Sequence, residues 1–263
     1  MIAALLACSP SQPGGDAGAM YRIQSTGDTA SRTSIVIGCV GQSNMSGVVP
    51  KGSGFAHSLL GDQAGVHAWH NGVELAEWPT FVGPQPFVVD ELLALGWPAE
   101  DIWIVTRATP GAALEVMRTS SVPALAADLA ALDLELDGLI FWQGEADARG
   151  STAAGYERKL NGSDGQPSLR GLQDELFGAY RWSVIELRVR DTGYASYAGQ
   201  QLVRAAQHMA GAYANTCTIP SYDLPLLPGQ NQPHVSLVGL EIGGRRALHG
   251  VLDIDTSGAA TCP

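Results

Sequence analysis

Short, almost wholly apolar runs recur along the chain and alternate with segments whose apolar residues have a helical spacing. The runs are rich in Ile, Val, Leu and Trp, and they lie at residues 34–40, 101–108, 136–144 and 181–189, with a weaker fifth run at 66–69. Strands that are buried on both faces of a parallel sheet have this composition. These runs therefore predict a central, mainly parallel β-sheet.

The segments between the runs predict helices. Apolar residues recur there at intervals of three and four, at residues 85–96, 122–136, 168–181, 197–214 and 236–252. Strands that alternate with helices indicate a three-layer α/β/α sandwich. A chain of 263 residues that is 45% hydrophobic can form one well-packed domain. We expect that domain to span residues 31–263.

The first 30 residues have a different character. The apolar stretch from Ile2 to Ala7 is too short to span a bilayer. It leads into Cys8 as the end of a bacterial lipoprotein signal does, but the basic residues that begin such a signal are missing, so either the start codon lies upstream or the match is a coincidence. Pro, Gly and Ser follow Cys8, as in a tether. We expect residues 1–30 to be a signal-like segment and linker of an exported protein, periplasmic or extracellular, with membrane contact only through a lipid anchor at Cys8.

The charge of the chain limits its partners. The formal net charge is −11, and only 16% of the residues are charged. Binding to nucleic acid or to an anionic membrane surface requires clustered Lys and Arg, so we expect neither partner. Uncharged substrates such as glycans and esters are compatible with an acidic surface.

The cysteines indicate no metal site. No CxxC or Cys/His spacing typical of zinc occurs, and Cys39 lies inside an apolar run, as a buried small hydrophobic residue does. Cys217 and Cys262 are candidates for a disulfide that would tie down the C-terminal tail in an oxidising compartment.

Residues with catalytic potential fall at the ends of the predicted strands. Ser43, Gly111 and Gln143 each follow one of these strands, and His234 comes just before the last predicted helix. Because ligands of parallel α/β sheets bind at the carboxyl ends of the strands, we expect these four residues to lie along one edge of the sheet.

This set of residues suits hydrolysis. A serine hydroxyl is a weak nucleophile until a neighbouring imidazole takes its proton, a role that His234 can fill for Ser43. The oxyanion that then forms needs preorganised donors. The candidate donors are the backbone N–H of Ser43, the backbone N–H of Gly111 and the side-chain amide of Gln143. Glycine at position 111 lets the main chain approach a substrate without a Cβ.

Several sequence blocks occur in the order found in the SGNH hydrolase superfamily. These blocks are GQSNM (41–45), GPQPFVVDELLALG (83–96), TPGAAL (109–114) and WQGEADA (142–148). They look most like the sialate O-acetylesterase and acetyl xylan esterase branch, as do LVRAAQ (202–207) and VGLEIGGRRA (238–247). The resemblance covers roughly residues 34–250. It implies the three-layer, flavodoxin-like fold of that superfamily.

The resemblance also implies an activity. It implies Ser43 as nucleophile, His234 as general base, and an oxyanion hole formed by Ser43, Gly111 and Gln143, with no metal. The corresponding enzymes are serine esterases that remove O-acetyl groups from sugars without a cofactor. An acetylated carbohydrate, such as a sialate, xylan or another glycan, is the expected substrate.

One residue departs from the family pattern. The last block of the family is Asp-x-x-His, whereas this sequence has Asn231 three residues before His234. Exchanging the triad aspartate for asparagine in serine proteases lowers kcat about 10⁴-fold. Three explanations are open: another acid orients His234, with Glu145 as first choice and Asp147 or Asp223 as alternatives; a slower Ser–His pair works with Asn231; or the site is degenerate.

Two other functions remain as hypotheses. The chain could be a non-catalytic or weakly active carbohydrate-binding relative, a hypothesis that Asn231 favours. It could also be a lipase or thioesterase of the same superfamily, against which the lack of a long apolar lid segment in the sequence argues.

Overall fold

The computed structural model of the protein describes residues 33–47, 49–50, 57–149, 151–162, 167–178, 180–189, 197–227 and 234–253. Within them, seven strands form one sheet in the order β4-β3-β6-β1-β7-β8-β9. The strands of this sheet are β1 (Ile35–Gly41), β3 (His67–His70), β4 (Val73–Glu74), β6 (Ile102–Ala108), β7 (Gly138–Trp142), β8 (Arg181–Ile185) and β9 (Thr216–Ile219). Neighbouring strands are parallel, except that β4 runs antiparallel to β3.

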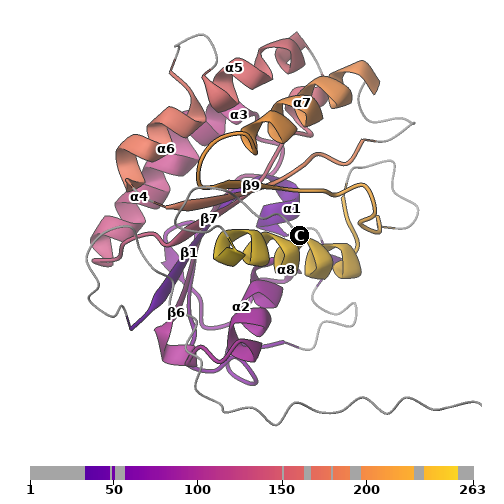
Figure 1. Ribbon diagram of the computed structural model, residues 1–263. Helices are drawn as coiled ribbons and strands as arrows, with labels where there is room; N and C mark the ends of the chain where they lie inside the picture. The colour runs from indigo at the N-terminus through magenta and orange to yellow at the C-terminus, as the bar shows by residue number, and fades with distance from the viewer. Residues whose placement is uncertain are drawn as a thin grey trace, which may run out of the picture.

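Helices cover both faces of the sheet (Figure 1). The core on one face is built with α2 (Gln85–Ala94) and α8 (Leu237–Asp253). The core on the other face is built with α4 (Val122–Ala131), α5 (Tyr156–Asn161), α6 (Leu169–Phe177) and α7 (Tyr197–Ala210). The remaining short elements are α1 (Ser43–Ser46), α3 (Leu114–Val116), the π-helix η2 (Met117–Ser121), the 3₁₀ turns η1 (Ala99–Asp101), η3 (Asp147–Arg149) and η4 (Ser151–Gly155), and a two-stranded ribbon of β2 (Val49–Pro50) and β5 (Phe81–Val82).

Strand β1 shows why its sequence run is almost wholly apolar. Ile35 and Ile37 belong to the core under α2 and α8, whereas Val36 and Val40 belong to the core under α4 to α7. All four side chains are buried, because β1 has neighbouring strands on both sides and helices above and below. The predicted fold class, a three-layer α/β/α sandwich with a mainly parallel sheet, is confirmed.

The strand order places the end of β1 at a switch point. The chain passes from β1 to β3 and β6 on one side of the sheet, and then crosses to β7, β8 and β9 on the other side. In one respect the order differs from that of flavodoxin, because β6 lies between β1 and β3. Ligands of open α/β sheets bind where the strand order reverses, outside the carboxyl ends of the strands. Ser43 lies two residues after the end of β1, and therefore at this reversal of the strand order.

Some of the helices were predicted to be longer than they are. The helix predicted at 122–136 ends at Ala131, and Asp133 then takes a left-handed backbone conformation with φ of 55°. The helix predicted at 85–96 ends at Ala94 and is followed by Gly96, whose φ is 91°. Sequence reasoning missed β9, because a four-residue edge strand is too short to give a clear periodicity.

The described residues include two of the cysteines discussed above, Cys39 and Cys217. Cys39 is free and buried in β1, and burial raises the pKa of its thiol to about 12, as expected for a structural cysteine. Cys217 in β9 is disulfide-bonded. Its predicted partner, Cys262, and the predicted lipidation site, Cys8, lie outside the described residues, so both remain predictions. None of the described helices is long and apolar enough to cross a membrane.

Candidate active site

The short segment after β1, which we call the nucleophile turn (residues 42–47), presents Ser43 at the carboxyl edge of the sheet. Gln42 N donates to Trp142 O of the adjacent strand at 3.1 Å, and Ser43 begins the single turn of α1. A Cβ at Gly41 would lie 2.3 Å from Trp142 O and 2.8 Å from Met45 Cβ. Glycine is therefore required at position 41 for the chain to turn this tightly against β7.

Ser43 and His234 meet although 191 residues separate them. His234 Nε2 lies 3.0 Å from Ser43 Oγ. His234 is half-buried in what we call the histidine segment (residues 234–236), which immediately precedes α8. This distance is within hydrogen-bond reach, as required for a base that accepts the proton of an attacking hydroxyl.

The surroundings of His234 favour its neutral form. Burial lowers the pKa of the imidazole below its usual 6.5, and the positive charge of Arg149 adds to this effect. A neutral imidazole that carries its proton on Nδ1 has an acceptor lone pair at Nε2. Near neutral pH, His234 is therefore able to take a proton from Ser43.

The two residues that flank Ser43 are bound to one carboxylate. Glu145 lies in the loop after β7, and its Oε1 accepts a hydrogen bond from Asn44 Nδ2 at 2.8 Å, while its Oε2 accepts one from Gln42 Nε2. Burial raises the pKa of Glu145 to about 7, partly offset by hydrogen bonds from its own backbone and from Asn44. Asn44 Oδ1 also accepts from Val235 N at 3.2 Å, which connects the nucleophile turn to the histidine segment.

The loop after β6 brings Gly111 to the same edge. Thr109 N donates to Gly41 O at 3.0 Å, next to the nucleophile turn. Gly111 has a φ of 70°, and a Cβ there would have no heavy atom within 4 Å, so the main chain borders open space. In the described parts of the chain, the backbone N–H groups of Ser43 and Gly111 have no hydrogen-bond acceptor.

Gln143 follows β7 as expected, but its side chain makes other contacts than expected. Its side chain is fully buried, and its Nε2 donates to Ala112 O at 3.1 Å and to Asp147 Oδ2 at 2.7 Å. Its Oε1 accepts from Tyr156 OH at 2.8 Å, which fixes the orientation of the amide. Both amide hydrogens are therefore engaged with the protein itself, and Gln143 supports the loop of Gly111 instead of presenting a free donor.

The proposed acids also have other partners. Glu145 binds Gln42 and Asn44, and Asp147 Oδ2 accepts from Leu114 N at 2.8 Å as well as from Gln143. Asp223 is exposed and forms a bidentate ion pair with Arg246 at 2.8 and 2.6 Å.

The expectation that one of these three acids orients His234 is therefore not met by their contacts. Across the described ranges, no carboxylate lies within hydrogen-bond distance of His234. Asn231 lies outside the described residues, so its role remains a prediction.

Gln42 and Asn44 were not among the site residues predicted from the sequence. Gln42 and Asn44 are 2% and 1% exposed, although both are amides in a short turn. Their positions directly beside Ser43 were the available signal, since buried amides require hydrogen-bond partners. The partner, Glu145, is more than 100 residues away and is found only from the tertiary structure.

One group of described side chains has the composition of a metal site. It consists of His57, Asp62 and Asp90. Asp62 Oδ2 lies 2.8 Å from His57 Nδ1, and Asp90 Oδ2 lies 2.8 Å from His57 Nε2. Because the two ring nitrogens face in different directions, these contacts describe an imidazole held between two carboxylates. The group includes Asp90 of α2 and does not include Ser43 or His234.

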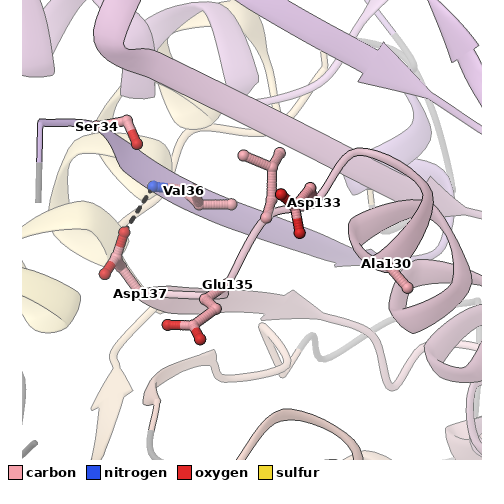
Figure 2. A pocket seen from close by; sticks show the side chains of 7 residues that line it. Ser34, Val36, Ala130, Asp133, Glu135 and Asp137 are labelled. Carbon is pink, nitrogen blue, oxygen red and sulfur yellow. Dashed lines mark hydrogen bonds between the residues drawn. The ribbon is translucent and has the colours of Figure 1, made fainter.

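A cleft of about 340 Å³ lies at the opposite edge of the sheet (Figure 2). It is bordered by residues that precede β1 and β7, including Ser34 and Asp137, and Asp137 Oδ2 accepts from Val36 N at 2.8 Å. This cleft is at the amino ends of the strands, whereas Ser43 follows a carboxyl end. It is therefore separate from the Ser43 site.

Comparisons with known proteins identify the fold. No protein-family model matches the sequence, and no curated protein sequence is similar to it. A solved structure of a protein from Arabidopsis thaliana is similar with a TM-score of 0.61 at 18% identity, over 82% of this chain and 96% of that one. A carbohydrate acetylesterase from Xanthomonas citri is similar with a TM-score of 0.54 at 17% identity, over 82% of this chain and 56% of that one. The chain thus shares with these structures an α/β fold, in which a mainly parallel sheet lies between two layers of helices.

Proposed function

We propose that this protein is a serine esterase that hydrolyses O-acetyl esters on carbohydrates. The observation that carries the proposal is the 3.0 Å distance between Ser43 Oγ and His234 Nε2 at the carboxyl edge of the sheet. The fold similarity to a carbohydrate acetylesterase supports the choice of substrate class. A net charge of −11 is compatible with an uncharged glycan substrate.

The reaction has two halves. Ser43 Oγ attacks the ester carbonyl carbon while His234 Nε2 takes the hydroxyl proton, and the tetrahedral intermediate collapses as the imidazolium protonates the departing sugar oxygen. Water then attacks the acetyl–serine ester, again with His234 as base, and acetate leaves. The imidazolium returns the proton taken from water to Ser43 Oγ, which regenerates free Ser43, and the deacetylated sugar has already left in the first half.

We assign two backbone donors to the oxyanion, the N–H groups of Ser43 and Gly111. Neither donates within the described structure, and Gly111 borders open space. Loss of one donor in a comparable hole lowers kcat about 10²–10³-fold. The role of Gln143 in this proposal is to hold Ala112 and, with it, the loop of Gly111.

Substitution of the nucleophile tests the proposal. Ser43→Ala removes the attacking oxygen, so the hydrolysis of 4-nitrophenyl acetate should fall by about 10⁴-fold or more while the thermal unfolding midpoint stays close to that of the wild type. Ser46→Ala, in the same helical turn, is the matched control and should keep wild-type activity. The hydrolysis of 4-nitrophenyl esters with longer acyl chains should be much slower than that of 4-nitrophenyl acetate.

Retention of activity in Ser43→Ala would show that another group performs the hydrolysis. Equal rates on long acyl chains would favour a lipase or thioesterase.

A non-catalytic carbohydrate-binding function is the second candidate. The observation that favours it is that no carboxylate among the described residues contacts His234. Calorimetry with an acetylated xylan oligosaccharide tests it. Binding without release of acetate would select the binding function, and release of acetate would select the esterase.

Export and a lipid anchor at Cys8 are further proposals. The disulfide bond of Cys217 supports an oxidising compartment. Fractionation of the producing cells, followed by mass analysis of the mature N-terminus, would test both.

A further inference from the structure

The carboxylate of Glu145 connects both sides of the Ser43 site. Glu145 is 2% exposed, and its two oxygens accept hydrogen bonds from Gln42 and Asn44, the residues before and after Ser43. Gln42 Oε1 in turn accepts from Ala146 N at 3.4 Å, a long bond that attaches the turn a second time to the same loop. The position of Ser43 is therefore determined by the end of β7 as well as by β1.

The same connection reaches the histidine. Asn44 donates to Glu145 through Nδ2 and accepts from Val235 N through Oδ1. Val235 directly follows His234, and its side chain is 1% exposed. A carboxylate in the loop after β7, an amide on the nucleophile turn and the backbone of the histidine segment thus form one buried chain of hydrogen bonds.

We propose that Glu145 is a positioning residue for the hydrolysis proposed above: its carboxylate holds the nucleophile turn and the histidine segment together so that Ser43 Oγ and His234 Nε2 stay in contact. This inference rests on the proposed function. It replaces the expected role of Glu145 as the acid that orients His234, because Glu145 acts through Asn44 and has no contact with the imidazole.

The chemistry of the site requires an acceptor with two oxygens. Gln42 and Asn44 both present an amide nitrogen, and an ionised carboxylate can accept from both because it has no hydrogen to donate. A glutamine at position 145 would place its own NH₂ group against one of these donors. In the described parts of the chain no Lys or Arg pairs with Glu145, so amide donors alone fix its orientation.

Protonation of Glu145 should weaken the same contacts. Burial raises the pKa of Glu145 to about 7, and a protonated carboxyl group carries a hydrogen that opposes an amide donor. Tyr156 interacts electrostatically with Glu145, but burial keeps its own pKa well above 10, so it stays neutral. Activity should therefore fall as the pH drops through about 7, above the lowered pKa of His234.

Glu145→Gln tests the inference, with Glu186→Gln as the matched control. Glu186 follows the adjacent strand β8 and is 3% exposed, but it pairs with Arg204 Nε at 3.1 Å and with His208 Nδ1 at 2.8 Å. Both variants remove a buried carboxylate from the same edge of the sheet. The kinetics of 4-nitrophenyl acetate hydrolysis should be measured between pH 5 and 9 for the wild type and both variants.

The expected result is a fall of about 10–100-fold in kcat for Glu145→Gln with little change in KM, because small displacements of catalytic groups have effects of this size. The acid limb of its pH profile should move from near 7 to a lower pH, because His234, whose pKa is lowered by burial, is then the titrating group of the catalytic pair. Glu186→Gln should keep the wild-type kcat and acid limb. Wild-type kinetics in Glu145→Gln, or equal losses in both variants, would overturn the inference.

Two further measurements keep the inference testable. If Glu145→Gln fails to fold, Glu145→Asp should lower kcat, because the shorter side chain cannot reach both Gln42 and Asn44, and an unchanged kcat would contradict the inference. If the wild type has no Ser43-dependent activity, the proposed function fails by itself. NMR titration of the His234 ring then tests whether Glu145 positions the histidine. Its chemical shifts should change in Glu145→Gln but not in Glu186→Gln, and unchanged shifts in Glu145→Gln would overturn the positioning role.

Discussion

The nucleophile turn and the histidine segment are held in different ways. The turn continues the central strand β1 directly, and its side chains at Gln42, Asn44 and Met45 are buried. Gln85 Nε2 donates to Met45 O at 2.7 Å and fixes the turn from the side of α2. The histidine segment instead leads into helix α8. It is attached mainly by backbone hydrogen bonds, from Leu227 N to His234 O at 3.1 Å and from Ser236 N to Pro225 O at 2.7 Å.

This difference shows where the geometry of the pair is vulnerable. The position of Ser43 follows from the packing of the sheet, whereas that of His234 follows from contacts between neighbouring loops. Asn44 joins the two segments, because it lies in the turn and accepts from Val235 N. Substitutions on each side should therefore have effects of different kinds and sizes.

The largest effect should come from removing either member of the Ser43–His234 pair. Ser43→Ala and His234→Ala should each lower kcat by about 10⁴-fold or more, and the double variant should be no slower than the worse single variant, since the two groups act as one unit. Single-turnover release of 4-nitrophenolate at high protein concentration measures these rates. Losses that multiply in the double variant would mean that the two residues act independently.

A smaller effect should follow from separating the two segments. Asn44→Ala removes the bond to Val235 N, so kcat should fall by about 10–100-fold with KM nearly unchanged. Asn161→Ala is the matched control, because Asn161 is 6% exposed and donates to Ala206 O at 3.0 Å in another part of the fold. It should lower the unfolding midpoint but leave kcat unchanged. Equal kcat in Asn44→Ala and the wild type would show that the histidine segment does not depend on the turn.

The smallest effect should come from the other end of the histidine segment. Ser236 precedes α8, and its Oγ accepts from Gly239 N at 3.2 Å as an N-cap. Ser236→Ala should lower the free energy of unfolding by about 1 kcal/mol, as measured by urea denaturation, because one N–H at the helix start loses its acceptor. Its kcat should remain within about threefold of the wild type, since the loss of one cap leaves the backbone bonds of the segment in place. A kcat loss as large as that of Asn44→Ala would place the main support of His234 in α8.

The sequence by itself determined the layers of the fold and the residues that line one edge. Apolar runs predicted four of the strands of the sheet and a weaker fifth. Strands that are covered by helices on both faces are buried on both sides and therefore consist mainly of Ile, Val and Leu. The sequence also predicted that Ser43 and Gly111 follow strand ends and that His234 precedes a helix. Because the carboxyl ends of parallel strands face the same way, these residues were expected at one edge of the sheet. The edge strand β9 and the short elements were too brief to give such a signal.

Only the tertiary structure decided what these residues contact. Glu145 was the first choice in the sequence for the acid, with Asp147 and Asp223 as alternatives. In the structure they bind Gln42 and Asn44, Leu114 and Gln143, and Arg246, respectively. Gln143 likewise has the right residue type at the expected place, yet its amide hydrogens are used inside the protein. The reason is physical: residue type fixes which hydrogen bonds a side chain is able to make, and the packing of distant segments decides which of them it does make.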